Sequence, residues 1–529
     1  METQNASVQK RTIRRLSFVR LALSIILALG GVGWAKTSFA DWQQSVQFDE
    51  SGYAPWFGAY VDVTSTPTYP FERYGSTAQL NNAVLAFIVS SPSDPCTPTW
   101  GGQYTLDDAG VMLDLDRRIA RFQEEGGRIA ISFGGLLNSE LGLKCTDPKA
   151  LAVAYRSVID RYRVSTVDLD LEGESLNDHA AAKRRADVIA QLQKTYREKG
   201  KPLAVWLTLP VAPQGLTKEG TDAVAQILAS GVDLAGVNFM TMDYGDSRNP
   251  NDSMADASKK ALIEGHRQLG ILYSQAGIYL NSASLWRKIG VTPMVGQNDT
   301  ADEVFMMNDA IEINQFSLAQ GVGRVSMWSA NRDIACGVNY ANLKVVSDVC
   351  SGVDAAAFAF AHTLGKGLEG DLLQSAKIVT VQDPQSNKLI IDDPNTSPYS
   401  IWQPNDVYLE GTKVVWHGNV YQAKWWTKGD LPDNPVLQSS DTPWQLIGPV
   451  LPGDKPIKLL VLPQGTYPQW QSEAIYNQGD RVMFNGIAYQ AKWWNQNQSP
   501  AAVALDPDNS PWMQLSQEQI TVIRQARRL

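Results

Sequence analysis

Between about residues 55 and 350, short β-rich runs alternate with segments that have helical character, and this alternation constrains the fold more than any other feature. Helical segments such as 180–198 and 222–229 separate most of these runs. Parallel strands joined by helices form either a closed (β/α)8 barrel of the TIM type or an open doubly wound sheet. No glycine-rich phosphate loop follows the first run, which favours the barrel. The expected strands are 58–63, 83–89, 128–133, 166–171, 203–209, 235–240, 291–295 and 324–327.

The fourth expected strand carries three acidic residues in alternation with apolar ones, Val-Asp-Leu-Asp-Leu-Glu at 167–172. A strand sends alternate side chains to opposite faces, so Asp168, Asp170 and Glu172 share one face. Mutual repulsion and burial are expected to raise the pKa of at least one of these carboxyls, which suits general acid catalysis near neutral pH. The alternative is an exposed edge strand with a solvated acidic face. The apolar, helix-like segment 151–159 before it favours a buried strand.

Glu174 is a second candidate for the acid, because it shares the parity of Glu172 if the strand continues. Gly173 is expected to start a loop at this point, so Glu172 is the favoured residue.

Composition excludes some partners. A net charge of −9 argues against nucleic acid. The chain has 16 tryptophans, many of them in its last third. Exposed aromatic rings bind the faces of sugars, although a small domain also needs such rings for its core.

The N-terminus has the pattern of a targeting segment. Basic residues from Lys10 to Arg20 precede an apolar run at 21–35, and Ser38-Phe39-Ala40 offers small residues at the spacing of a signal peptidase site. We expect residues 1–40 to be a signal peptide and the protein to be secreted. The alternative is an uncleaved signal anchor that holds it at the periplasmic face, although the apolar run is short for a membrane span.

Four cysteines in an exported chain indicate two disulfides, and three pairings are possible. Spacing favours Cys336–Cys350 as a local bridge, which leaves Cys96–Cys145. Reduced, buried cysteines are the alternative. No Cys or His cluster has zinc spacing, so neither a metal nor a cofactor is expected.

Beyond residue 352 the pattern changes. Residues 353–397 have the composition of a connector, and a repeat with an offset of 68 residues follows. Tyr-Gln-Ala-Lys-Trp-Trp occurs at 421–426 and again at 489–494. Two small β modules are therefore expected, at 398–450 and 466–516, each near the lower size limit for independent folding.

Four motifs in the first part resemble one family. Ser-Phe-Gly-Gly at 132–135, Asp-Leu-Asp-Leu-Glu at 168–172, Asn-Phe-Met-Thr-Met-Asp-Tyr-Gly at 238–245 and Met-Trp-Ser at 327–329 lie in the order found there. The chain resembles a bacterial family 18 glycoside hydrolase, a chitinase, with two C-terminal chitin-binding modules of the Ala-Lys-Trp-Trp type. The resemblance implies a (β/α)8 catalytic domain at 50–352 that hydrolyses β-1,4-N-acetylglucosamine linkages of chitin or chitooligosaccharides.

The resemblance also implies a retaining mechanism in which the substrate's own acetamido group acts as nucleophile. Glu172 would be the acid, Asp170 would hold the acetamido N–H, and Asp168 would share a proton with Asp170. Asp243 and Tyr244 would orient the acetamido group. The further substrate-binding candidates are Ser132, Gly134, Gly135, Met242 and Trp328. For the two glycines and Ser132, a structural role is the stronger expectation.

In the modules, the aromatic residues of the repeat are the candidate chitin-binding groups, with one ring of each Trp pair in the core and the other exposed. They are Tyr421, Trp425, Trp426, Tyr489, Trp493 and Trp494. Two further functions stay open: a catalytically inactive chitin-binding lectin or adhesin, and an endo-β-N-acetylglucosaminidase that acts on N-glycans. A monomer is expected.

Overall fold

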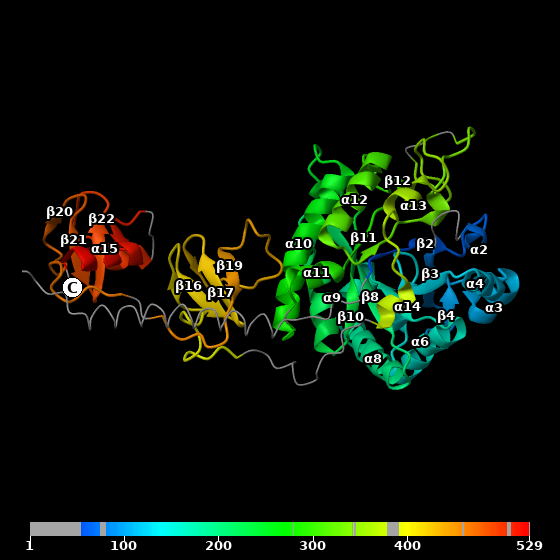
Figure 1. Ribbon diagram of the computed structural model, residues 1–529, viewed down its shortest axis with the longest axis horizontal. Helices are drawn as coiled ribbons and strands as arrows, with labels where there is room; N and C mark the ends of the chain where they lie inside the picture. The colour runs from blue at the N-terminus through cyan, green and yellow to red at the C-terminus, as the bar shows by residue number, and fades with distance from the viewer. Residues whose placement is uncertain are drawn as a thin grey trace, which may run out of the picture.

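The computed structural model describes residues 54–74, 81–278, 280–340, 342, 345–377, 391–457, 460–504 and 509–527. Figure 1 shows one large α/β unit and two smaller β units, coloured yellow to red. The expected signal peptide at 1–40 lies outside the described residues. Among the residues that are described, no helix is both long and apolar enough to cross a membrane.

A parallel sheet forms the centre of the large unit. Its order is β1-β14-β11-β10-β8-β7-β6-β3, and β2 pairs with β3. Only Gly58 separates β1 from β2, so the first extended segment pairs with the last strand through β1 and with the next strand through β2. The strands are β1 (Trp56–Phe57), β2 (Ala59–Asp62), β3 (Asn82–Ser90), β6 (Arg128–Gly134), β7 (Thr166–Asp170), β8 (Ala204–Ala212), β10 (Leu234–Met240), β11 (Ile289–Thr292) and β14 (Arg324–Val325).

Each expected run coincides with a strand, with shifts of a few residues at the ends. The largest difference is at 291–295, where β11 starts at Ile289 and ends at Thr292. Short strands outside this set are β4 (Pro98–Trp100), β5 (Tyr104–Thr105), β9 (Gly215–Leu216), β12 (Gly296–Gln297) and β13 (Val304–Phe305).

Helices connect the strands and pack on the sheet (Figure 1). The expected helices at 151–159, 180–198 and 222–229 are confirmed as α6, α8 and α9. Side chains at their N-termini set where they begin: Asp178, for example, accepts a hydrogen bond from the Ala181 amide at 2.8 Å at the start of α8. The longer helices are α4 (Leu115–Glu124), α6 (Pro148–Tyr162), α8 (His179–Glu198), α9 (Lys218–Ala229), α10 (Met254–Gln275) and α12 (Met307–Gln320), and the shorter ones are α2 (Phe71–Tyr74), α3 (Leu106–Met112), α5 (Leu141–Lys144), α7 (Gly173–Asn177) and α11 (Ser282–Arg287).

The two faces of the sheet carry different side chains. Val167 and Leu169 of β7 belong to the large apolar cluster that includes the helices. A second cluster on the other face contains Trp56, Tyr60 and Trp206. Asp168 and Asp170, at the alternate positions of β7, are buried as well. The expected alternation along β7 is therefore confirmed, and both of its faces are covered.

The chain beyond residue 352 continues to build this unit. Phe360 of α13 (Ala359–Leu364) joins the large cluster, and Leu372 of α14 (Leu372–Lys377) packs with Trp56 and Trp206. The amide of Leu372 also donates to Asn82 Oδ1, at the start of β3. The prediction of a connector from 353 is therefore wrong for 353–377, because apolar side chains there fill the core.

Two disulfides join Cys96 to Cys145 and Cys336 to Cys350. The pairing favoured by the spacing is confirmed. The first bridge links the loop between β3 and β4 to the residue that ends α5, and the second joins two cysteines 14 residues apart in the sequence.

The two small units repeat one layout. Each has a three-stranded antiparallel sheet and a two-stranded sheet. The first contains β15 (Val407–Tyr408), β16 (Lys413–Trp416), β17 (Asn419–Ala423), β18 (Thr427–Lys428) and β19 (Trp444–Pro449), and the second contains β20 (Ile475–Tyr476), β21 (Arg481–Phe484), β22 (Ile487–Ala491), β23 (Asn495–Gln496) and β24 (Trp512–Gln514), followed by α15 (Gln517–Arg527).

The first small unit contacts α10 through polar groups. Gln268 Nε2 donates to the carbonyl of Pro435 at 2.9 Å, and Gln275 Nε2 donates to the carbonyl of Asp433 at 3.0 Å. These side chains of α10 satisfy backbone acceptors in a loop of the module, so the contact is specific to that loop.

Close packing of α10 on β10 predicts a sharp difference between two glycines of that helix. A Cβ on Gly265 would lie 1.9 Å from the Phe239 ring, whereas a Cβ on Gly270 would meet only the Leu285 methyl at 3.2 Å. We expect Gly265→Ala to lower the free energy of unfolding by about 2 kcal/mol through overpacking. Gly270→Ala should change it by less than about 1 kcal/mol and in the stabilising direction, since alanine favours a helix.

Urea denaturation of the two variants and the wild type measures both values. Equal stabilities for the two variants would contradict the packing of α10 on Phe239.

Candidate active site

Strand β7 positions the acidic residues. It lies between β6 and β8, with Asp168 opposite Ser132 and Trp206. The alternative of an exposed edge strand is therefore wrong. Glu172 lies two residues beyond the end of β7, and it is the residue before the first turn of α7. The three carboxyls thus follow one another from within the strand to its carboxyl end, where parallel α/β folds place their ligands.

Asp168 is held by four hydrogen bonds. Its Oδ1 accepts from Thr208 Oγ1 at 2.7 Å and from Arg324 Nη1 at 2.6 Å. Its Oδ2 accepts from Tyr60 at 2.8 Å and from Ser132 at 2.7 Å. Donors from four other strands therefore occupy both oxygens of Asp168. The sharing of a proton between Asp168 and Asp170, which the resemblance implies, stays a prediction.

Asp170 is buried in a different environment. Its Oδ1 has no hydrogen-bond partner among the described residues. Burial raises the pKa of Asp170 well above its usual range, and the charges of Glu172 and Asp168 raise it further, while Arg324 lowers it. Asp170 is therefore a carboxyl that holds its proton easily and has an oxygen available for a ligand.

The glycines at the end of β6 support Asp170 from its backbone side. Gly135 N donates to the Asp170 carbonyl at 3.0 Å, and a Cβ on Gly134 would lie 2.0 Å from the same oxygen. Both glycines have positive φ, +109° and +83°, which other residues rarely adopt. These contacts, with that of Ser132 on Asp168, agree with the structural role expected for Gly134, Gly135 and Ser132.

Glu172 has the properties of a general acid. Burial raises the pKa of Glu172 to about 7, and the charge of Asp243 contributes to the rise. The environment of Glu174 is different: its side chain is 82% exposed, and its carboxylate lies 3.8 Å from Lys144 Nζ. The geometry therefore favours Glu172 over Glu174.

The loop after β10 brings Asp243 near Glu172. Asp243 is exposed, has a φ of 51° and accepts from the Thr300 amide at 2.8 Å. The buried carboxylate of Glu303 accepts from the next two amides, those of Tyr244 at 3.0 Å and Gly245 at 2.8 Å. These bonds hold the loop that carries Asp243. Met242, just before it, is partly buried.

Tyr244 points away from the carboxyls. Its ring is buried against α10 and its hydroxyl lies 3.2 Å from Ser258 Oγ. The predicted role of Tyr244 in orienting the substrate is therefore corrected to packing of the loop on α10. Strand β10 ends at Met240, so the alternation of side chains no longer holds at 244.

Trp328 and Phe87 form an aromatic pair beside the site. Their ring centroids are 5.5 Å apart with 23° between the planes, and the Tyr60 ring lies 6.0 Å from Trp328. Trp328 and Phe87 are both partly exposed, so their faces can receive an apolar sugar face.

Sequence reasoning missed four residues of the site: Tyr60, Phe87, Thr208 and Arg324. One signal could have found three of them. Tyr60, Thr208 and Arg324 stand in expected strands, at positions whose side chains point to the same face as Asp168. Phe87 gave no such signal, because the pairing of β3 with β6 shifts register between Leu85 and Ile88.

The aromatic residues of the two modules divide into two groups. All four tryptophans of the repeat are exposed: Trp425 by 44%, Trp426 by 36%, Trp493 by 43% and Trp494 by 58%. Tyr421 and Tyr489 are buried instead. The prediction of one core ring in each Trp pair is wrong, and so is the assignment of the two tyrosines to binding, because Tyr408, Trp444 and their counterparts supply the module cores.

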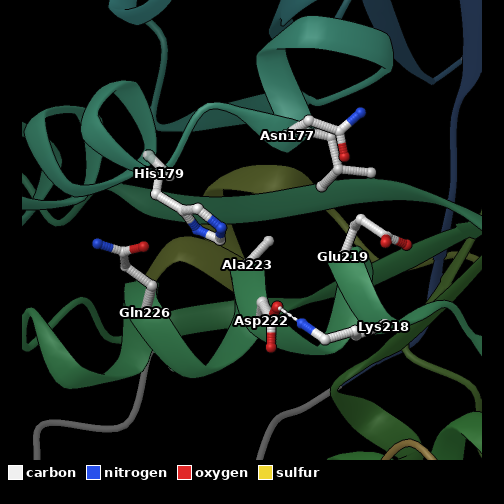
Figure 2. Close-up of a pocket in the computed structure, with 9 residues that line it drawn as sticks. Asn177, His179, Lys218, Glu219, Asp222, Ala223 and Gln226 are labelled. Carbon is white, nitrogen blue, oxygen red and sulfur yellow. Dashed lines mark hydrogen bonds and ion pairs between the residues drawn. The ribbon is translucent and has the colours of Figure 1, made fainter.

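A separate hollow lies beside α7. It has a volume of about 160 Å³ and lies between α7, the start of α8 and α9 (Figure 2). Polar side chains line it, including His179, Glu219 and the ion pair between Lys218 and Asp222 at 2.6 Å. None of the β7 carboxyls lines this hollow. The hollow is therefore separate from the candidate active site, which is the group of residues around Asp170 and Glu172. Within the described part of the chain, no group of three His, Cys, Asp or Glu side chains is arranged to hold a metal ion.

Comparisons with known proteins agree with this division of the chain. The family described as "Carbohydrate-binding module family 5/12" matches residues 401–445 and 469–512. The Escherichia coli K12 protein named "Probable bifunctional chitinase/lysozyme" is 32% identical over 311 residues, which are 57% of this chain and 34% of that protein. "Endochitinase 11" of Metarhizium anisopliae is 30% identical over 305 residues, 56% of each chain.

Solved structures are similar to the large unit. The catalytic domain of a hyperthermophilic chitinase from Pyrococcus furiosus superposes with a TM-score of 0.51 at 27% identity, over 60% of this chain and 97% of that one. A catalytic-site mutant of active domain 2 of the Pyrococcus chitinase, solved with chito-oligosaccharides, gives the same TM-score at 28% identity. The α/β unit is thus similar to chitinase catalytic domains, and the two small units that follow it match the carbohydrate-binding module family. The chain spans less than two thirds of the length of either curated relative.

Proposed function

We propose that this protein is a chitinase of the bacterial family 18 type, which hydrolyses β-1,4 linkages between N-acetylglucosamine units of chitin. The observation that carries the proposal is the pair Asp170 and Glu172: two successive inward carboxyls with raised pKa values at the carboxyl end of β7, beside Trp328. Relatives named as chitinases and a chitinase structure with chito-oligosaccharides support the substrate class.

The proposal includes a closed (β/α)8 barrel as the scaffold. Support comes from the pairing of β1 with β14 and of β2 with β3, since these two segments are neighbours in the chain. Barrels of this type place their active sites at the carboxyl ends of the strands, which is where Glu172 lies.

The chemistry proceeds in two steps on the substrate's own acetamido group. In the first, Glu172 gives its proton to the glycosidic oxygen, the bond from this oxygen to the anomeric carbon breaks, and the acetamido oxygen bonds to that carbon. The free oxygen of Asp170 accepts a hydrogen bond from the acetamido N–H. The negative charge of Asp170 offsets the positive charge of the oxazolinium ion. In the second step, Glu172 takes a proton from water, the water oxygen bonds to the anomeric carbon, and the acetamido group is released with overall retention.

Trp328 stacks beneath the reacting sugar in this proposal, and Phe87 extends the same aromatic surface. Asp243 acts through Glu172, because its charge favours the protonated acid. Asp168 and Ser132 do not contact the substrate in this proposal. Their hydrogen bond fixes the side chains beneath Asp170.

The modules bind the polymer. Each presents two adjacent exposed tryptophans after its Ala-Lys motif, and two linked modules raise the effective concentration of the second contact. Export to the cell exterior is part of the proposal: the N-terminal segment supports it, and so do the two disulfides, which form in oxidising compartments.

Glu172→Gln tests the role of the acid. The amide keeps the shape of the side chain but cannot donate the proton, so turnover of a chromogenic chitobioside should fall by several orders of magnitude while the thermal midpoint changes little. Glu174→Gln is the matched control and should stay near wild type. Binding to chitin with no release of product from the wild type would instead favour the lectin, and release of glycans from a glycoprotein would favour the endo-β-N-acetylglucosaminidase.

The pH profile has a predicted alkaline limit. Glu172 must be protonated to act, and its pKa is raised to about 7, so the alkaline limb of kcat/KM should lie near this pH, with activity declining above it. Asp243→Asn removes a charge that contributes to the rise, so the alkaline limb should move to lower pH. It should not fall to the value of a free glutamate, because burial is the larger cause. The nearby exposed Asp246→Asn serves as control, and an unmoved limb in Asp243→Asn would contradict the coupling.

The exposed rings predict the result of module mutagenesis. Trp493→Ala or Trp494→Ala should weaken retention of the protein on insoluble chitin, since one lost stacking contact of about 1 kcal/mol corresponds to roughly fivefold in affinity. Val522→Ala on α15, another exposed apolar side chain of this module, should leave retention unchanged. Binding isotherms on chitin beads measure the effect, and equal retention of all variants would contradict a binding role for the Trp pair.

A further inference from the structure

The inner face of the sheet holds a buried cation that the two chemical steps above do not use. The Arg324 side chain, at the start of β14, is 1% exposed. Its Nη1 donates to Asp168 Oδ1 at 2.6 Å, its Nη2 donates to the Tyr60 hydroxyl at 2.9 Å and its Nε donates to Ser326 Oγ at 2.8 Å. Three different neighbours therefore fix the orientation of the guanidinium group.

Aromatic rings enclose the same group. Arg324 Cζ lies 5.1 Å from the Trp56 ring centroid, 5.3 Å from that of Tyr60 and 5.4 Å from that of Trp206. Ring faces stabilise a desolvated cation, and a guanidinium group does not lose its proton in proteins. Arg324 is thus a permanent positive charge with no access to water.

We infer that Arg324 is a positioning residue for the acid chemistry: it fixes the orientation of the Asp168 carboxyl, and the positive charge that it places behind Asp170 sets the pH at which Asp170 and Glu172 take up a second proton. The inference rests on the proposed function. Arg324 has no acceptor atom, so Asp168 Oδ1 cannot donate a proton toward it. Asp170 and Glu172 lie nearer the carboxyl end of β7. They then hold the proton at the place where the glycosidic oxygen would bind.

The other groups that face these carboxyls agree with this assignment. Burial raises the pKa of Tyr60, so its hydroxyl stays neutral and donates to Asp168. The charge of Asp168 raises the pKa of Asp170, and that of Arg324 lowers it. Asp243 faces Glu172 from the loop after β10. The remaining neighbours, from β6, β8, β10 and β11, are uncharged: Ser132, Thr208, Asn238 and Thr292.

The inference predicts how the acidic limb of the pH profile responds to substitution. At low pH the pair Asp170 and Glu172 takes up a second proton and loses the negative charge that the oxazolinium ion needs. Arg324→Met removes the cation that opposes this uptake, so the acidic limb of kcat/KM should move to higher pH. Arg324→Lys keeps a positive charge beside Asp168 and should leave the limb nearer its wild-type position.

A double variant separates positioning from plain stability. Arg324→Met alone leaves an unpaired buried carboxylate and should lower the thermal midpoint, whereas Arg324→Met with Asp168→Asn removes both charges and should recover most of the loss. In the double variant the acidic limb should return to the wild-type pH or below it, because Asp168 affects Asp170 more than Arg324 does. If Arg324→Met does not fold, Arg324→Lys and the double variant still decide the question.

Arg185→Met is the matched control. Arg185 and Glu140 form an equally buried ion pair at 2.8 Å, and neither contributes to the shifts at Asp170 or Glu172. This variant should lose stability without moving the acidic limb. The experiment uses the full chain, a chromogenic chitobioside and kcat/KM divided by the folded fraction at each pH. An acidic limb that is the same in wild type, Arg324→Met and the double variant would overturn the inference and leave Arg324 a purely structural residue.

Failure of the proposed function has a different signature. A wild type that folds but releases no product contradicts the chitinase proposal and leaves the ion pair to be tested by unfolding alone. In that case the thermal midpoint of Arg324→Met should recover toward that of the wild type as the solution is acidified, because protonation removes the negative charge left without its cation. The double variant lacks that charge and should show no such recovery. The same pH dependence in Arg324→Met and in the double variant would overturn the inference.

Discussion

The hydrogen-bonded pairing of β7 between β6 and β8 obliges the protein to bury carboxyl groups. Side chains at alternate positions of a strand point to one face, and on β7 that face is the inner one. A carboxylate without water or partners is costly to bury, so the surrounding strands must supply hydrogen-bond donors or a counter-charge. Asp168 receives both, from Tyr60, Ser132, Thr208 and Arg324. The aromatic and hydroxyl side chains on the inner face follow from this one requirement.

The environments of the three carboxyls differ because the number of hydrogen-bond donors around each one decreases from Asp168 to Glu172. Asp168 is saturated with donors, Asp170 has an oxygen with no described partner, and Glu172 has only burial and a neighbouring like charge to set its pKa. Residues of similar chemistry, two positions apart, thereby obtain different environments: Asp168 is fixed by donors, Asp170 keeps an oxygen available for a ligand, and Glu172 is a buried carboxyl with a raised pKa.

In the two modules, packing of the core likewise determines which aromatic side chains are exposed. In each module a buried tyrosine packs against a buried tryptophan at nearly the same geometry, Tyr408 with Trp444 at 5.2 Å and Tyr476 with Trp512 at 4.9 Å. These pairs fill cores too small to need the Trp-Trp motif as well. All four rings of that motif are consequently left at the surface.

Local periodicity in the sequence was sufficient to locate the strands and helices and the face shared by Asp168, Asp170 and Glu172, because each depends only on neighbours along the chain. Comparison of the chain with itself located the 68-residue repeat. Local periodicity was insufficient at Tyr244, where β10 has already ended, and at 353–377, where a segment of loop-like composition fills the core. Only the tertiary structure decided that Arg324, 156 residues from Asp168 in sequence, would lie against it. The protonation of a buried carboxyl depends on charges brought together by folding, and their distances are not a property of the sequence spacing.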